Sequence, residues 1–154
     1  MTAFELNVYT SDLSLSFDPK ANLLNVNNVN IFGNTTVNII SLSIFKSSII
    51  VITDTDDLRL SVADSYRNKG VGNMYSFSLN GNLLWSADDL LKEHHFPFCG
   101  GRILMENYKL SYEKWHGLKF QENHEYFDAF TFADEHYIID VTENKFLSKV
   151  VIRG

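Results

Sequence analysis

The sequence has few cysteines, which can cross-link a chain, and few prolines, which interrupt helices and strands. It has one cysteine, Cys99, and only two prolines among its 154 residues. A single cysteine excludes an internal disulfide. A chain of this length can bury about two-thirds of its unfolded surface. We therefore expect one domain, residues 1–154, that folds without disulfides, cofactors or a metal ion.

Positive charge is also scarce. Thirteen lysines and arginines face nineteen acids, which gives a net charge of −6. Nucleic acids and anionic membranes are bound through lysine and arginine side chains. The composition therefore predicts neither of them as a partner and favours a basic protein partner. It says nothing of the oligomeric state.

Long apolar runs are missing too. No segment approaches the roughly 20 apolar residues that a membrane helix requires. The first residues, MTAFELNVYTSDLS, lack the basic start and the apolar stretch of a secretory signal. We expect a cytoplasmic location.

Aromatic residues are abundant, at 14% of the chain, and apolar residues alternate with polar ones in many short segments. A period of two places one set of side chains on one face of a sheet. The pattern predicts a mainly β fold, as an antiparallel β-sandwich or a strongly curved sheet. The clearest alternating segments are 4–8, 13–17, 75–79, 108–112 and 146–152.

Two segments indicate details of the strands. Val37 and Ile39 are out of phase with Ile40, Leu42 and Ile44, which predicts a β-bulge or a strand buried on both faces. The most apolar segment, 48–53 (SIIVIT), is expected at the centre of a sheet.

Three segments read as strand, turn and strand: 15–24, 77–85 and 138–147. The Asn80-Gly81 pair is the strongest hairpin signal among them. The three segments recur roughly every 60 residues, which is either a true repeat or the convergence that hairpins show easily.

One short helix is predicted near residues 87–94. Ser86 precedes Asp88 and Asp89 in the manner of a helix start, with acids at the positive end of the helix dipole. Pro97 limits its length, and Gly100-Gly101 indicates a chain reversal.

Candidate catalytic chemistry is weak, and we predict no catalytic residue. His94, His95 and Cys99 lack the spacing of a metal site. Cys99 also lacks the local signature of a thiol enzyme. A hydrolase that uses a histidine–carboxylate pair stays open, and it requires a histidine within hydrogen-bond reach of an acid in a cleft. The candidate histidines are His116, His124 and His136.

The segment 121–144 is the most informative one for function. It contains seven acids, five aromatic residues and no lysine or arginine. Aromatic rings provide buried area and carboxylates provide steering at protein interfaces. The opposing interpretation is that the aromatics face the core and the acids only solvate the outer face. The predicted partner-binding residues are Glu122, Glu125, Tyr126, Asp128, Asp134, Glu135 and Tyr137.

Two resemblances follow from these segments. Residues 73–85, NMYSFSLNGNLLW, resemble the strand–turn–strand of a quinoprotein-type propeller blade through Tyr75, Asn80-Gly81 and Trp85. No quinone cofactor is inferred, because 154 residues cannot close a propeller of usual size. The short length, the hairpins and the lack of chemistry are similar to small acidic immunity proteins of bacterial toxin systems, including contact-dependent growth inhibition.

The second resemblance implies a cytosolic protein that binds a cognate toxin, often a basic nuclease, and covers its active site. We expect this function, without enzymatic activity. Besides the hydrolase, two non-enzymatic functions stay open. One is a small-ligand-binding β protein with an aromatic-lined cavity, and the second is a module whose edge strands pair with copies of itself.

Overall fold

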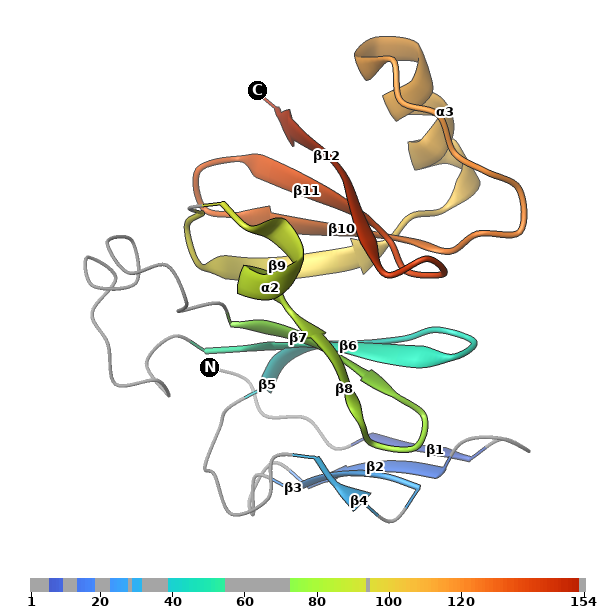
Figure 1. The fold of residues 1–154 in the computed structure, drawn as a ribbon, viewed down its shortest axis with the longest axis vertical. Coiled ribbons are helices and arrows are strands. Elements are labelled where there is room, and N and C mark those ends of the chain that lie inside the picture. The colour runs from blue at the N-terminus through green and yellow to red at the C-terminus, as the bar shows by residue number, and fades with distance from the viewer. Residues whose placement is uncertain are drawn as a thin grey trace.

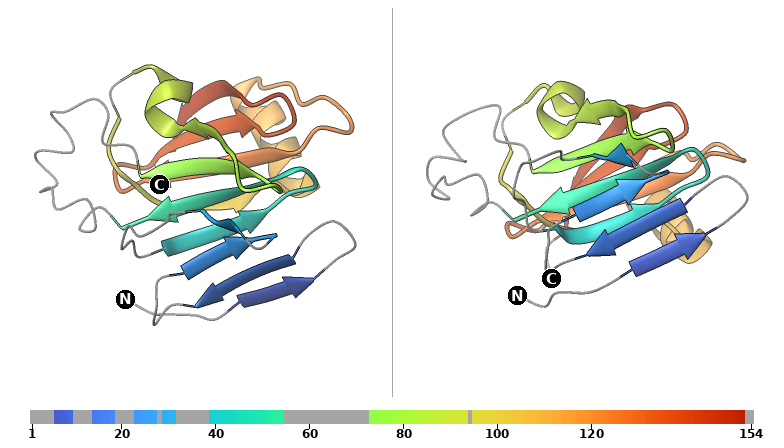
Figure 2. Two further views of the ribbon diagram at one scale, coloured as in Figure 1. Left: turned by 60° about the horizontal axis from the view of Figure 1, so that its bottom comes forward. Right: turned by 90° about the horizontal axis from the view of Figure 1, so that it is seen from below.

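The computed structural model describes residues 6–9, 14–18, 23–27, 29–31, 39–54, 73–93 and 95–152. Within these residues the fold is mainly β, as the alternation predicts, and its strands form three antiparallel sheets of four strands each. Figures 1 and 2 show the sheets stacked on one another, and the sheet whose strands lie within residues 39–86 is in the middle.

The strands follow the chain from one sheet to the next. Sheet A contains β1 (Leu6–Tyr9), β2 (Ser14–Asp18), β3 (Leu23–Val26) and β4 (Val29–Asn30). Sheet B contains β5 (Ile39–Ile44), β6 (Ser48–Thr53), β7 (Met74–Ser78) and β8 (Leu83–Ser86). Sheet C contains β9 (Phe98–Ile103), β10 (Tyr126–Thr131), β11 (Glu135–Asp140) and β12 (Lys145–Val151). In each sheet the spatial order is the chain order. A propeller blade is also a sheet of four strands.

The three predicted hairpins are confirmed. They are the pairs β2–β3, β7–β8 and β11–β12, one in each sheet. In the β7–β8 turn Gly81 has a φ of +85°, a left-handed conformation that glycine adopts without strain. Its backbone N–H donates to the carbonyl of Ser78 at 2.9 Å.

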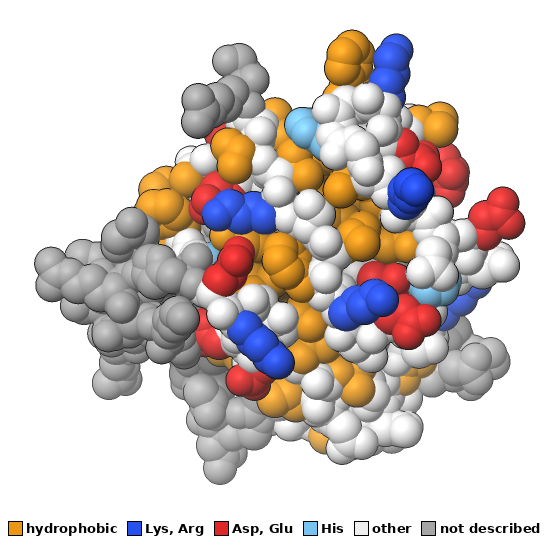
Figure 3. Space-filling view, turned by 45° about the horizontal axis from the view of Figure 1, so that its top comes forward, with side chains coloured by type: hydrophobic (Ala, Val, Ile, Leu, Met, Phe, Trp, Pro, Cys, Tyr) orange, Lys and Arg blue, Asp and Glu red, His pale blue; other side chains and the backbone are white. Residues whose placement is uncertain are grey.

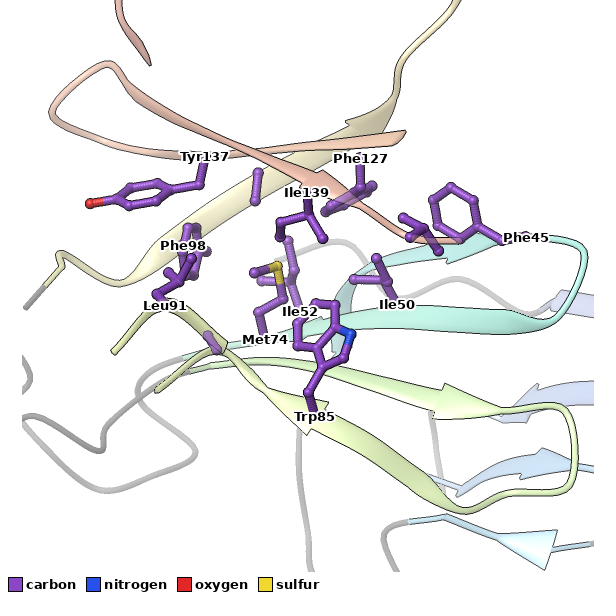
Figure 4. Packing of buried hydrophobic residues seen from close by; sticks show 13 residues of the cluster. Phe45, Ile50, Ile52, Met74, Trp85, Leu91, Phe98, Phe127, Tyr137 and Ile139 are labelled. Atoms are coloured by element: carbon purple, nitrogen blue, oxygen red, sulfur yellow. The ribbon is translucent and has the colours of Figure 1, made fainter. Parts of the chain in front are cut away.

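Sheet B is buried on both faces, as expected for its central strand β6. Ile50 and Ile52 point into the layer between sheets B and C, while Ile49 and Val51 point into the layer between sheets A and B. All four side chains are completely buried. Figure 4 shows the first layer, where side chains from β6, β7 and β8 meet those from sheet C.

The predicted bulge lies at the start of β5. The register with β6 shifts between Ile39 and Ser41. Ile39 and Leu42 both pack toward sheet A although three positions separate them, and Ile40 packs toward sheet C. The bulge therefore supplies apolar side chains to both layers from one strand.

The two ends of the stack are closed differently. In sheet A, the pair Leu15–Val26 is buried toward sheet B, and the neighbouring pair Ser16–Asn25 is only half-buried and polar. The outer face of sheet C instead buries an apolar cluster beneath α3 (Glu106–His116). A polar face needs no cover, whereas an apolar face has to be packed against another element.

The predicted short helix is confirmed as α2 (Ala87–Leu91). Ser86 is its N-cap residue, but its hydroxyl bonds the carboxylate of Asp89 at 3.0 Å and not a backbone N–H. The helix ends at Lys92, whose φ is +55°. None of the helices in the described ranges is long and apolar enough to span a membrane.

Residues 108–112 form part of helix α3, so the prediction of a strand there is wrong. Tyr108, Leu110 and Tyr112 alternate with polar residues, but only Tyr112 is buried on sheet C. The helix ends at Gly117, whose φ of +68° is a common helix terminus. Glu106 in the first turn and Lys114 in the last suit the helix dipole.

Gly100 and Gly101 lie inside strand β9, so the predicted chain reversal is also wrong. The ring of Phe127 packs directly over Gly101, and the ring of Phe130 packs over Gly100. A Cβ atom at either glycine would overlap these rings. The two glycines therefore make room for aromatic side chains of the neighbouring strand β10.

Asn73 joins sheets B and C through its side chain, which is completely buried. Its Nδ2 donates to the carbonyls of Thr53 and Phe98, each at 2.7 Å. Its Oδ1 accepts from the N–H of Phe98 at 2.8 Å. One amide thus satisfies backbone groups at the end of β6 and the start of β9.

Candidate functional site

A buried polar network lies between α3 and the outer face of sheet C. Asp128 on β10 is fully buried, and its Oδ2 accepts from Tyr112 Oη at 2.8 Å and from Arg102 Nε at 3.1 Å. Its Oδ1 accepts from His136 Nδ1 at 2.8 Å. The guanidinium of Arg102 lies 3.8 Å from the ring centroid of Tyr108. A buried carboxylate is stable only when it is paired in this way.

The network shifts the ionisation of its members. Partial burial lowers the pKa of Arg102, but the Asp128 carboxylate and the Tyr112 hydroxyl together outweigh this effect, so the pKa of Arg102 is raised. Burial, and then the negative charge of Asp128, raise the pKa of Tyr112. Tyr112 is therefore a neutral hydrogen-bond donor at neutral pH, and the network ties α3 to the sheet.

A second histidine–carboxylate pair anchors the segment 117–125. His124 Nδ1 lies 2.8 Å from Oδ2 of the buried Asp140, and its Nε2 lies 3.9 Å from Glu143. The N–H of Gln121 donates to Tyr126 Oη at 2.9 Å. These contacts fix the position of residues 120–123 beside α3.

Both histidine pairs meet the distance that a histidine–carboxylate hydrolase requires. Neither His124 nor His136 lines any of the three hollows of the described residues that are discussed below. The carboxylate of Asp128 already accepts bonds from Arg102 and Tyr112. Asp128 thus has three hydrogen-bond partners within the protein, and the hydrolase stays an open alternative.

Several residues predicted to bind a partner are part of the interior. Tyr126 and Tyr137, expected as exposed anchors, are buried, as is Asp128. The reason is that β10 and β11 are covered on both faces, by sheet B on one and by α3 on the other. Alternation along these strands therefore does not lead to a solvent-exposed face.

The remaining predicted acids do not form one surface. Glu135 pairs with Lys149 at 3.1 Å, and Glu125 accepts from the backbone N–H of Lys46 at 3.1 Å. Glu122 and Asp134 are exposed, but they lie beyond opposite ends of β10, which is roughly 17 Å long. The expectation of a single acidic face from 121–144 is corrected accordingly. Binding by the exposed acids stays a prediction.

Glu122 belongs to a different acidic surface, which the structure assembles with α3. A groove of about 450 Å³ is lined by Glu106, Lys109, Glu113 and residues 120–123. Lys109 bonds Glu106 at 3.2 Å, whereas Glu113 and Glu122 form no ion pair with a lysine or arginine of the described residues. We name it the α3 groove. Glu106 and Glu113 were not predicted from the sequence, because alternation indicated a strand there. Gly117 was the signal that would have indicated a helix end.

Two large apolar side chains of α3 are exposed, and one of them is next to the groove. Leu110, between Glu106 and Glu113 on α3, is 64% exposed. Trp115, on another side of the helix, is 70% exposed, with the Lys114 ammonium 5.0 Å from its ring centroid. Figure 3 shows hydrophobic and basic side chains projecting together at the α3 end of the molecule.

The metal and thiol candidates have other roles. His95 is buried against the ring of Phe98, with a centroid distance of 4.8 Å, and its Nε2 lies 3.3 Å from Asp88. His94 lies outside the described residues. The Cys99 thiol donates to the carbonyl of Phe130 at 3.5 Å, and burial raises its pKa. Among the described residues, no group of three or more His, Cys, Asp and Glu side chains is placed to hold a metal ion.

Two further hollows are lined by residues from the strands and turns of both sheet B and sheet C. One, of about 140 Å³, is lined mainly by polar residues, among them Lys46, Asn123 and Thr142. The other, of about 540 Å³, lies between β8 and β12 and includes Trp85 and Phe146. The aromatic rings of the interior pack against one another between the sheets (Figure 4).

The comparisons with known proteins place no further constraint on the site. No protein-family model matches the sequence, no curated protein is similar to it, and no solved structure matches the fold.

Proposed function

We propose that this protein acts by binding another protein, and that it is an immunity protein that neutralises a basic toxin domain by covering its active site. The observation that supports the proposal is the α3 groove, where Glu113 and Glu122 face solvent beside the exposed Leu110. A lysine or arginine of the partner would enter between the two carboxylates. An apolar group next to it would cover Leu110.

The physical basis is complementarity of charge and exclusion of water. A toxin that cleaves nucleic acid carries basic side chains where it holds phosphates. Glutamates at an exposed groove accelerate association with such a surface, and the buried apolar contact slows dissociation. Inhibition by covering an active site needs no catalytic group on the inhibitor. The proposal includes a cytosolic location, where toxin and inhibitor would meet.

The test begins with the genes beside the gene for this chain, among which the proposal expects one that encodes a toxin domain. Coexpression is expected to rescue growth, and the two proteins are expected to co-purify. Replacing both glutamates, Glu113→Lys and Glu122→Lys, should weaken association roughly tenfold or more at low salt. Leu110→Ser should chiefly increase the dissociation rate.

The matched control is Glu93→Lys, a charge reversal at an exposed acid after α2 that does not line the groove. It should leave the affinity within about twofold. The proposal fails if the neighbouring genes encode no toxin, or if the groove reversals and Glu93→Lys affect binding equally.

A further inference from the structure

Asp128 holds two neighbouring side chains by their inner nitrogen atoms. Arg102 donates to Asp128 Oδ2 from Nε at 3.1 Å, and His136 donates to Oδ1 from Nδ1 at 2.8 Å. Neither bond uses the outer nitrogen atoms, which are Nη1 and Nη2 of Arg102 and Nε2 of His136. These outer atoms are therefore left for another molecule.

Both side chains reach the surface, whereas the carboxylate that holds them does not. The side chain of Arg102 is 35% exposed and that of His136 is 15% exposed, but that of Asp128 is fully buried. The three residues lie on the neighbouring strands β9, β10 and β11 of sheet C. One buried carboxylate thus orients, from within the protein, two side chains that a ligand can contact from solvent.

Aromatic rings restrict the two side chains further. The guanidinium of Arg102 lies 3.8 Å from the ring centroid of Tyr108, and the ring centroid of His136 lies 5.6 Å from that of Phe130. Binding groups that are fixed before a ligand arrives lose little conformational entropy when it binds. Tyr108 and Phe130 are also partly exposed, so they offer apolar surface beside the two polar groups.

The hydrogen-bonding pattern of the outer nitrogen atoms indicates the chemistry of the ligand. The guanidinium of Arg102 offers N–H donors in a planar fork, which matches the oxygens of an oxyanion. Because Nδ1 of His136 donates to Asp128, neutral His136 has an unprotonated Nε2 that accepts a hydrogen bond. The charge of Asp128 balances that of Arg102, so the site selects by hydrogen bonds more than by net charge. A phosphate monoester with one P–O–H group both accepts and donates.

We propose that Arg102 and His136 bind the phosphate group of a phosphate monoester at the surface of sheet C beside α3. The guanidinium donates to two phosphate oxygens, and the P–O–H group donates to Nε2 of His136. The organic part of the ester lies against Tyr108 and Phe130. No residue of this site lines the α3 groove, so the proposal does not depend on the proposed function.

The probes are phenyl phosphate and phenyl sulfate, which share a ring and differ in the acidic group. At about pH 6 a phosphate monoester is half in the form that carries a P–O–H group, which a sulfate ester lacks. Titrations of the unmodified protein followed by 1H–15N NMR measure both affinities. Phenyl phosphate is expected to bind about fivefold more tightly than phenyl sulfate. The largest shifts are expected at the backbone amides of Gly100 and Arg102, and not at residues 121–123.

Two variants assign the roles of the side chains. His136→Asn keeps an N–H donor for Asp128 but removes Nε2, so the preference for phenyl phosphate should disappear. Arg102→Lys keeps the positive charge but not the planar fork, and it should weaken binding of both esters about tenfold. Circular dichroism establishes that the variants fold. Glu113→Lys with Glu122→Lys should leave both affinities within about twofold, which separates this proposal from the proposed function.

Three outcomes would overturn the proposal. Equal affinities of the unmodified protein for the two esters would mean that Nε2 accepts no hydrogen bond from the ligand. A preference for phenyl phosphate that persists in His136→Asn excludes His136. Absence of shifts at Gly100 and Arg102 in the unmodified protein would mean that the esters bind elsewhere, and this result does not depend on whether the variants fold.

Discussion

Asp128 and Arg102 stand directly opposite each other on β10 and β9, and Arg102 Nε donates to Asp128 Oδ2 at 3.1 Å. The carboxylate is fully buried, while the guanidinium reaches toward the surface beneath Tyr108. The ion pair therefore extends from the surface, where Arg102 is partly exposed, into the interior between α3 and sheet C, where Asp128 is buried. Its contribution is largest when one partner is removed, because the other charge then stays without compensation.

Asp128→Ala is expected to destabilise the protein by about 3–5 kcal/mol, since it leaves Arg102, Tyr112 and His136 without their common acceptor. Urea denaturation followed by circular dichroism measures the change. Glu122→Ala, at an exposed acid, is the control and should stay within about 0.5 kcal/mol. A small effect of Asp128→Ala would show that the network does not hold α3 on the sheet.

Loss of the hydroxyl should lower the free energy of unfolding at one buried tyrosine and leave it unchanged or raise it at another. Tyr112→Phe removes the donor to Asp128 and should cost about 1.5–3 kcal/mol, the usual value for a bond to a charged group. The hydroxyl of Tyr137 is buried and makes no hydrogen bond within the described part of the protein. Tyr137→Phe should therefore be neutral or stabilising by up to about 1 kcal/mol. Urea titrations of the two variants measure their free energies of unfolding. Equal losses of stability would contradict the assigned difference in hydrogen bonding between the Tyr112 and Tyr137 hydroxyls.

The same tyrosines predict a loss of stability in alkali. Burial raises the pKa of both Tyr112 and Tyr137 above the ordinary value of about 10. The folded state thus binds the phenolic proton more tightly than the unfolded state. The resulting stabilisation is complete below pH 10 and declines as the pH rises from there through the folded-state pKa.

The unfolding free energy should therefore fall steeply between about pH 10 and 11.5, which urea titrations at several pH values will show. In the Tyr112→Phe protein the decline should be shallower, because one of the tyrosines whose pKa burial raises no longer titrates. An unchanged slope in that variant would place the alkaline sensitivity elsewhere.

Replacing Gly101 or Gly117 with alanine should reduce stability for different reasons and by different amounts. At Gly101 a methyl group would overlap the buried ring of Phe127, and overpacking of this kind costs about 1–3 kcal/mol. At Gly117 nothing lies within 4 Å of the added Cβ, and only the left-handed φ of +68° opposes alanine, at about 1 kcal/mol. Thermal unfolding measures both losses.

A second substitution separates the two causes. Phe127→Leu should reduce the additional cost of Gly101→Ala, because the ring that the methyl group meets is gone, and it should not change the cost of Gly117→Ala. Additive losses for Gly101→Ala and Phe127→Leu would mean that the ring is not the obstacle.

Local features of the fold follow from the sequence because their causes are local. Alternation, the Asn80-Gly81 turn and the phase slip after Ile39 each act over a few residues, and the hairpins, the turn and the bulge are where they are expected. The strand predicted at 108–112 failed because alternation over so short a stretch also fits a helix with one buried residue, Tyr112. The glycines of β9 were misread because the rings over them come from β10, a contact far apart in sequence.

The candidate site was less predictable for the same physical reason. Acids in 121–144 alternate with aromatic residues, and this pattern predicts one solvent-exposed face of the sheet. In the structure, sheet B covers one face of β10 and α3 covers the other, so neither face is exposed to solvent. Asp128 and Tyr126 are therefore interior residues. The surface at Glu122 depends on Glu106 and Glu113, and only the folding of α3 brings these together.

Asn73 has a mechanical consequence for the stack. Hydrophobic attraction between the apolar side chains of sheets B and C is non-directional, whereas hydrogen bonds require a particular alignment of their partners. The Asn73 amide fastens the last carbonyl of β6 to the first residue of β9 with directional bonds at 2.7–2.8 Å. The Asn73 hydrogen bonds therefore specify one alignment of the end of β6 relative to the start of β9.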